Sequence, residues 1–292
     1  TDYEEMINSV DVDGIWFVIP PNQHKNEIIS AAKKGIAIFA EKPQSLYLDE
    51  IFPMAEAIEK NNVPSICGFQ MEYDPWYTKV RSYLEKKIIS SMMMISCGAV
   101  ETHGVKHSVI SKDEGPQNRI WTADRNWSGT SMVEAGIHQT DLMRYWASDE
   151  IEWVISNYVE RPESLQKSQG NNPISYHASF GLKKGGIANL TLTKPAGVFF
   201  MERYDYILTT NSMIKFEDDL MVYGIDQDNY DIDLGRKHFK NKNVFKKEEI
   251  EKVIAKGPHN DPMGQMNTKK ISECFIKSII NNKPELRNNS FT

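Results

Sequence analysis

A lysine and the residues beside it have types and a position that suit proton chemistry. Lys42 stands in the tripeptide Glu41-Lys42-Pro43, directly after the apolar run Ile36–Ala40. If that run is a strand of a parallel sheet, Lys42 lies at its carboxyl end, where ligands of open α/β sheets bind. A solvated lysine in a strand-to-helix loop is the alternative. Position alone makes Lys42 a candidate for stabilising a developing alkoxide.

A second group of chemical residues lies between positions 131 and 146. On one continuous helix, Glu134, His138 and Asp141 stand at i, i+4 and i+7, so they fall within about 60° of one another. Carboxylates on that face could tune the imidazole and hold its tautomer. His138 could then accept and donate a proton near neutral pH.

The same segment allows plainer roles. Ser131 and Glu134 match a capping box, and Asp141 and Arg144 are spaced for an ion pair on one helix. A divalent metal could use the Glu, His and Asp side chains. However, no HxxxH pair or thiolate set accompanies them, so we expect no metal. Gly136 costs about 1 kcal/mol relative to Ala in mid-helix, which favours a close approach by backbone or ligand.

Two smaller signals flank these groups. The segment Pro20-Pro21-Asn22-Gln23-His24 ends an apolar run, so Asn22 and His24 would face the same crevice as Lys42. Asn22 could instead cap the next helix. Trp121 and Trp127 flank a polar loop, where they could stack on a sugar ring or simply anchor the loop.

The elements that would position these residues alternate in the first part of the chain. Strand-like runs at 13–20, 36–40 and 64–69 are separated by helix-like periods at 24–34 and 46–61, and another helix follows at 75–87. Pro53 must kink or start the second of these helices. This order is typical of a parallel sheet with right-handed crossovers.

The second part of the chain has a different character. After a helix at about 131–146, strand-like stretches follow one another without an intervening helix, at 151–161, 176–183, 186–194, 204–210 and 212–216. A final helix at 265–281 has Ile271, Phe275, Ile276, Ile279 and Ile280 on its apolar side. We therefore predict an α/β chain. A partial Rossmann-type parallel sheet occupies residues 1–88, and an α+β domain with a large, mostly antiparallel sheet occupies residues 89–292.

Composition excludes several classes of function. The 292 residues include 34 Lys+Arg and 40 Asp+Glu, and the net charge of −6 gives no broad attraction for nucleic acid. No apolar run approaches the roughly 18 residues that span a membrane. The three cysteines, Cys67, Cys97 and Cys274, have no CxxC spacing. This argues against a disulfide framework or thiolate zinc site and fits a reducing cytoplasm, where we place the protein.

The order of four segments resembles the glucose–fructose oxidoreductase/inositol dehydrogenase (Gfo/Idh/MocA) family. The segments are DVDGIWFVIPPNQH, AAKKGIAIFAEKP, ICGFQMEYDPWYTK and SGTSMVEAGIHQTDLMRYW. The resemblance covers residues 1 to about 150. It implies hydride exchange between NAD or NADP and a carbinol or carbonyl of a sugar, polyol or related compound.

Roles for single residues follow from the resemblance. It implies that Lys42 hydrogen-bonds the reacting oxygen and that His138 accepts and donates the proton. Glu134 occupies a position beside the substrate where the family usually has Asp, and Asp141 matches a supporting residue. Cofactor contacts are implied for Pro20, Asn22, His24, Glu41 and Lys42, and substrate contacts for Trp121 and Trp127.

The sequence departs from the family pattern in two places that matter here. Its 17 glycines include no G-x-G pair, so the family's phosphate-binding turn is missing. At about 30 residues per β-α unit, we expect this chain to be part of a longer oxidoreductase that has about 60 more residues at its N-terminus. Met71 and Glu72 occupy positions where the family commonly carries two arginines.

Two other functions remain open at this stage. One is an NAD-dependent glycosidase of the same family, and the other is a non-catalytic regulator that senses a nucleotide or sugar on this fold. In either case we expect a small sugar-like or polyol-like partner. We also expect a homo-oligomer, a dimer or tetramer, because open antiparallel sheets often pair across a two-fold axis.

Overall fold

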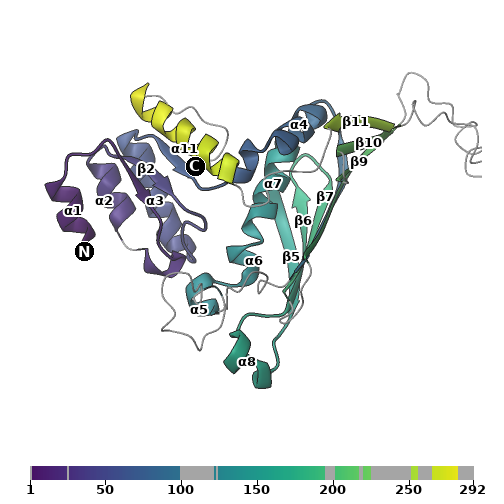
Figure 1. Ribbon diagram of the computed structural model, residues 1–292, viewed down its shortest axis with the longest axis horizontal. Coiled ribbons are helices and arrows are strands. Elements are labelled where there is room, and N and C mark those ends of the chain that lie inside the picture. Colours follow the sequence, from purple (N-terminus) through teal and green to yellow (C-terminus); the bar gives the residue numbers. More distant parts are fainter. Residues whose placement is uncertain are drawn as a thin grey trace, which may run out of the picture.

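The computed structural model describes residues 2–24, 26–98, 122, 124–194, 201–216, 220–224, 251–255 and 265–281. These residues form two sheets that stand apart, with helices on and between them (Figure 1). The predicted fold class is confirmed: a small parallel sheet comes first, and a larger sheet follows.

The first sheet consists of β1 (Gly14–Phe17), β2 (Ala37–Ala40) and β3 (Ser65–Cys67), all parallel and in that order. Its helices are α1 (Tyr3–Ser9), α2 (Glu27–Lys33) and α3 (Leu48–Asn61). The predicted strands and crossover helices are therefore confirmed, each somewhat shorter than expected. Pro53 lies inside α3 rather than at its start, five residues after the first helical residue, Leu48.

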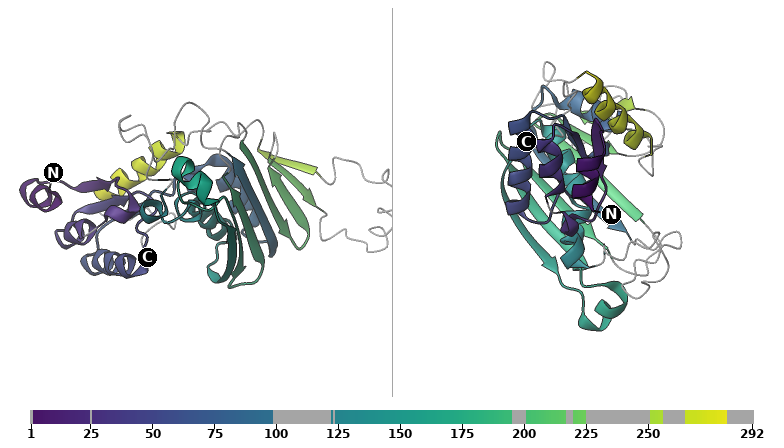
Figure 2. Two further views of the ribbon diagram at one scale, coloured as in Figure 1. Left: turned by 90° about the horizontal axis from the view of Figure 1, so that it is seen from below. Right: turned by 90° about the vertical axis from the view of Figure 1, so that its left-hand side faces the viewer.

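The two faces of this sheet are covered from opposite ends of the chain. Residues of α2 and α3, such as Ile28 and Met54, are fully buried in one apolar cluster with Ile38 of β2. The other face receives α11 (Gln265–Ile280), whose Phe275 ring lies edge-on to Trp16 with centroids 4.7 Å apart. Figure 2 shows α11, in yellow, beside the purple N-terminal strands. Helix α11 thus belongs to the predicted second domain, residues 89–292, but packs on the sheet of the first. The predicted domain boundary at residue 88 stays a prediction.

The apolar side of α11 is narrower than the sequence indicated. Ile271 and Phe275 are buried and Ile279 is partly buried against them. Ile276 and Ile280, also predicted on this side, are 45 % and 75 % exposed. The reason is that the sheet under α11 is only three short strands wide.

The second sheet has eight strands in the order β11-β10-β9-β8-β4-β7-β6-β5. Its strands are β4 (Ile89–Gly98), β5 (Ile151–Val159), β6 (Ser175–Leu182), β7 (Ile187–Thr193), β8 (Met201–Thr209), β9 (Ser212–Phe216), β10 (Leu220–Gly224) and β11 (Glu251–Ala255). All neighbours run antiparallel except β4 and β7, so the prediction of a mostly antiparallel sheet is confirmed. β4, which lies in the middle of the sheet, was not predicted from the sequence, and neither were β10 and β11.

One face of this sheet is covered by α4 (Pro75–Leu84), α6 (Ser131–Glu134) and α7 (Ile137–Ala147). Trp146 of α7 is the largest fully buried side chain there, and it packs against Tyr77 of α4. Shorter elements complete the fold: η1 (Pro21–Gln23), η2 (Gln70–Tyr73), α5 (Arg125–Ser128) and α8 (Glu163–Gln169). None of the helices in the described ranges is both long enough and apolar enough to cross a membrane.

The predicted helix at 131–146 is two helices, and that prediction is wrong. α6 ends at Glu134, and Gly136 is the N-cap of α7. A Cβ on Gly136 would stand 2.5 Å from the backbone oxygen of Met132, so a larger residue would clash with α6 where α7 begins. The close approach predicted at Gly136 is therefore present, but it is an approach of the backbone of its own chain.

Candidate active site

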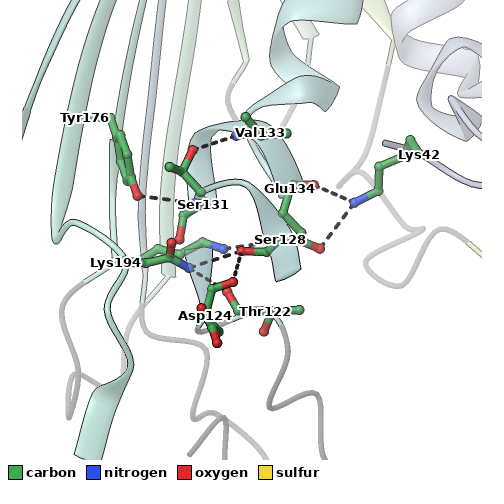
Figure 3. A network of polar contacts seen from close by, with 11 residues as sticks. Lys42, Thr122, Asp124, Ser128, Ser131, Val133, Glu134, Tyr176 and Lys194 are labelled. Carbon is green, nitrogen blue, oxygen red and sulfur yellow. Dashed lines mark hydrogen bonds and ion pairs between the residues drawn. The ribbon is translucent and has the colours of Figure 1, made fainter. Parts of the chain in front are cut away.

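The predicted Lys42 and Glu134 meet between the two sheets. Lys42 follows β2, at the carboxyl end of the parallel sheet. Its Nζ donates to the backbone oxygen of Glu134 over 2.6 Å and contacts the Glu134 carboxylate at 3.3 Å (Figure 3). Both side chains are largely buried, at 13 % and 8 % exposure. The ammonium has three N–H donors, and these contacts take up two of them.

A third residue, absent from the sequence predictions, joins this pair. The Nζ of Lys194, just past the end of β7, lies 3.8 Å from Glu134 Oε2. Lys42 and Lys194 therefore lie on two sides of one carboxylate, as Figure 3 shows. The only local signal for Lys194 was its position at the end of a predicted strand.

The first turn of α6 fixes where Glu134 lies. Thr130 is the N-cap, and its hydroxyl accepts a hydrogen bond from the backbone N–H of Val133 at 3.3 Å. The backbone N–H of Ser131 donates to the hydroxyl of Tyr176 on β6. The predicted capping box is therefore wrong, because Ser131 is inside the helix and Thr130 caps it. Glu134 is left available to contact the two lysines.

His138 lies in the first turn of α7 and is half-buried. Burial lowers its pKa to about 3, and the positive charges of Lys42, Arg203 and Lys194 add to this while Glu134 opposes it. Its buried Nδ1 has no hydrogen-bond partner among the described residues. We expected a ring that titrates near neutral pH. Instead burial and the neighbouring positive charges keep the imidazole neutral there.

Asp141 does not share the contacts of Lys42 and Glu134. Its carboxyl is buried, and burial raises its pKa, with the Glu72 carboxyl of η2 as a neighbour. The predicted ion pair with Arg144 is also wrong as the main contact, because Arg144 donates to both carboxylate oxygens of Glu150, at 2.7 and 2.8 Å. The break at Gly136 is the reason that Glu134 and Asp141 do not lie on one helix face.

The residues predicted to contact a cofactor lie around the end of β1. Asn22 is in η1 and does not cap α2, whose N-cap is Asn26. His24 is buried, and its Nδ1 lies 2.5 Å from Glu27 Oε1. Asn22 Oδ1 and His24 Nε2 are buried polar atoms without a partner in the described part of the chain. Such atoms fit a polar ligand, since unpaired polar groups in an interior are costly.

The other predicted contacts differ in how the structure places them. The Glu41 carboxylate lies against Gly68, where a Cβ would stand 2.6 Å from Oε2, and burial raises the Glu41 pKa. Pro20 precedes η1. Trp127 is on α5, which packs against η1, and it is 42 % exposed. Trp121 lies outside the described residues.

No metal centre emerges from the described residues. Nowhere in those ranges do three or more His, Cys, Asp or Glu side chains come together in a way that could hold a metal ion. Glu134 and Asp141, two of the groups that sequence spacing placed near His138, have lysine and glutamate neighbours respectively.

A short parallel sheet with a lysine at its carboxyl edge, facing a second sheet with a histidine on its helices, defines a two-part α/β protein of the Rossmann type. Residues 1–69 match the family model GFO_IDH_MocA, described as an oxidoreductase family with an NAD-binding Rossmann fold. This match covers the first part of the chain and agrees with the resemblance that the four sequence segments indicated.

Several relatives and solved structures are similar to the chain. An uncharacterized oxidoreductase, YrbE, of Bacillus subtilis is 27 % identical over 52 % of this chain and 40 % of that protein. The scyllo-inositol 2-dehydrogenase (NAD(+)) of the same organism is 26 % identical over 67 % of this chain and 53 % of that protein. The chain thus spans about half the length of these relatives.

Solved structures share the fold across almost the whole chain. Scyllo-inositol dehydrogenase from Lactobacillus casei, with bound NAD(H) and scyllo-inositol, superposes with a TM-score of 0.68 at 18 % identity. The match covers 100 % of this chain and 76 % of that one. Levoglucosan dehydrogenase in complex with NADH and levoglucosan gives a TM-score of 0.72 at 17 % identity, covering 99 % and 76 %.

Proposed function

We propose that this chain belongs to an NAD- or NADP-dependent dehydrogenase that acts on a sugar, a polyol or a related compound. The observation that carries the proposal is the contact of Lys42 with Glu134 between the two sheets, near enough to His138 that both charges shift the pKa of its imidazole. A dehydrogenase needs a hydrogen-bond donor for the reacting oxygen and a base for its proton. The family match and the dehydrogenase names of its relatives support the same activity.

The residues present suit the nicotinamide end of the cofactor. Asn22 and His24 offer buried polar atoms at the end of β1, and Glu41 and Lys42 follow β2 at the same edge. We assign these residues, together with Pro20, to the cofactor side of the site. The cofactor, when bound, supplies the acceptor for a hydride from the substrate carbon.

The chain's own residues then handle the hydroxyl of the substrate. Lys42 Nζ uses its remaining N–H to hold the reacting oxygen and stabilise its developing negative charge. The imidazole of His138, which is uncharged at neutral pH, accepts the hydroxyl proton. Glu134 holds Lys42 in place through its backbone oxygen and its carboxylate, and Lys194 holds the other oxygen of that carboxylate.

Turnover with single variants tests these assignments. The purified protein is given NAD+ or NADP+ with scyllo-inositol, myo-inositol or levoglucosan, and reduced cofactor is measured. His138→Ala should lower turnover by about 10²–10⁴-fold, and Lys42→Ala by about 10²–10³-fold. His177→Ala and Lys60→Ala are matched controls on exposed residues and should retain activity. Unchanged turnover in the first two variants would reject the assigned roles.

The same assay separates the alternative functions. Release of a sugar from a glycoside without net accumulation of reduced cofactor would indicate the glycosidase. Cofactor or sugar binding without turnover would indicate the regulator. A cytoplasmic location stays a prediction of the sequence.

We also infer that the protein self-associates through the outer face of the large sheet. Seven apolar side chains on that face are 41–70 % exposed: Met93, Ile95, Trp153, Ile155, Val159, Ile187 and Tyr204. The described helices pack on the opposite face, as the left view in Figure 2 illustrates. An apolar face of this extent favours a partner surface of the same kind across a two-fold axis.

A further inference from the structure

Two carboxyl groups are buried together where η2 meets α7. Glu72 of η2 is 1 % exposed and Asp141 of α7 is 5 % exposed. The two elements pack against each other. Two ionised carboxylates buried beside each other in an interior would repel each other strongly.

A hydrogen bond between the carboxyl groups of Glu72 and Asp141 requires that one of them is protonated. Glu72 Oε2 and Asp141 Oδ2 receive no hydrogen bond from an N–H or hydroxyl donor in the described part of the chain. Each carboxyl group instead has the other as a neighbour, and each shifts the pKa of the other. An ionised carboxylate can only accept, so a hydrogen bond between the two exists only while one of them keeps its proton.

Nearby cations do not replace that proton. Arg81 of α4 and Arg144 of α7 favour the ionised forms, but Arg81 donates to the backbone oxygen of Tyr145 at 2.8 Å. Arg144 is engaged with Glu150. From α11, Lys270 donates to the backbone oxygen of Tyr73 rather than to either carboxyl.

Two further acidic groups nearby do not supply the missing proton donor. Asp74 follows η2, and one of its carboxylate oxygens accepts from Asn267 of α11. The Cys67 thiol at the end of β3 is held neutral, because burial raises its pKa and Asp141 raises it further.

The charges beside the pair decide which carboxyl holds the proton. Burial raises the pKa of both groups, but the charge of Asp141 raises that of Glu72 further, whereas Arg144 lowers that of Asp141. Glu72 is therefore the group that keeps its proton and can donate it to Asp141.

We propose that protonated Glu72 donates a hydrogen bond to the Asp141 carboxylate, and that this shared proton locks η2 to α7, the helix that carries His138. Asp141 stands one helical turn after His138, so the lock fixes the turn on which the imidazole stands. Glu72 is a positioning residue that acts through Asp141. The inference concerns how α7 is held, and it does not depend on the proposed activity.

The proton lock predicts a definite dependence of stability on pH. A carboxyl whose pKa is higher in the folded than in the unfolded protein stabilises the fold fully below the ordinary carboxyl pKa of about 4. That contribution is lost as the pH rises toward the raised pKa of Glu72. Above the pKa of Glu72 both buried carboxyl groups are ionised, and the hydrogen bond that joins η2 to α7 is lost.

Denaturant unfolding between about pH 5 and about pH 9.5 tests the lock. We expect the unfolding midpoint of the natural chain to fall as the pH rises. In Glu72→Gln the fall should be clearly smaller, because the amide donates to Asp141 at every pH. Glu85→Gln, an exposed residue at the end of α4, is the matched control and should follow the natural chain. If the unfolding midpoint depended on pH equally steeply in Glu72→Gln and in the natural chain, the proposal would be overturned.

Two further measurements keep the test decisive. Infrared spectroscopy at neutral pH should show the carbonyl stretch of a protonated carboxylic acid, and Glu72→Gln should lose it. Absence of this band from the natural chain would mean that both groups are ionised, which rejects the lock. If Glu72→Gln does not fold, Asp141→Asn replaces it in the test. The unfolding midpoint of Asp141→Asn should depend less on pH than that of the natural chain, because its amide can donate to Glu72.

Discussion

The Nζ atom of Lys42 donates a 2.6 Å hydrogen bond to the backbone oxygen of Glu134, and this bond joins the end of the parallel sheet to the helices on the second sheet. The two residues are 92 positions apart. Because the acceptor is a backbone oxygen, the course of the α6 backbone determines where the Lys42 ammonium lies. Its position therefore does not depend on the rotamer of the Glu134 side chain.

The charges around His138 predict how its pKa responds to substitution. Lys42 and Lys194 both lower this pKa, and the effect of Lys42 is larger. We expect Lys42→Met to raise the pKa of His138, and Lys194→Met to raise it less. Glu134→Gln should lower it, because Glu134 opposes the lysines. NMR titration of the imidazole measures each value, and Lys60→Met on the exposed end of α3 is the control. A higher pKa in Glu134→Gln would contradict this arrangement of charges.

His138 also predicts a loss of stability in acid. Its pKa is about 3 in the folded chain and about 6.5 when unfolded, so the unfolded chain binds the proton more readily. The contribution of His138 is complete above about pH 6.5 and is lost as the pH falls toward 3.

We therefore expect His138→Asn to lose less stability than the natural chain between about pH 6.5 and pH 4. Urea unfolding at several pH values measures the difference. Glu72 acts with the opposite sign, since its contribution grows as the pH falls. Only a comparison of matched variants separates the two, and His177→Asn, an exposed histidine on the large sheet, is the control.

Local sequence predicted the elements whose patterns are local. The apolar run before Lys42 and the helices on both sides of it form as expected, because burial on both faces leaves a continuous apolar signature. β4 escaped prediction because Met93, between the buried Met92 and Met94, is itself apolar although it is 41 % exposed. Three methionines in a row hide the alternation that marks a half-buried strand.

The candidate site was predictable only in part, because contacts between distant segments leave no local pattern in the sequence. Lys42 and His138 stood out by motif and order, whereas the contact of Lys194 with Glu134 depends on where β7 ends relative to α6. No spacing in the sequence encodes that distance. The break at Gly136 was also hidden, because a glycine in a helical pattern can mark a close contact or an end.

Gly136 gives a prediction about the geometry of the site. Gly136→Ala brings a methyl group to 2.5 Å from the backbone oxygen of Met132, and a backbone atom cannot rotate away as a side chain can. We expect the free energy of unfolding to fall by about 1–3 kcal/mol, as is usual for overpacked interiors. The substitution should also displace Glu134 relative to His138, so the NMR-measured pKa of His138 should change. An unchanged stability and pKa would show that α6 can shift without cost.

The outer face of the large sheet gives the last prediction, which concerns self-association. Ile155 is 70 % exposed on β5 and lies on the same face as Ser179 of β6, its partner across the sheet. Ile155→Asp places a charge on this face, on the edge strand β5, so it should shift an oligomer toward the monomer in analytical ultracentrifugation. Val154 is adjacent, 57 % exposed and directed to the opposite face, beside Phe180. Val154→Asp adds the same charge to the same strand, and we expect it to leave the association unchanged. Dissociation by both variants would indicate that the edge of β5, rather than the face, makes the contact.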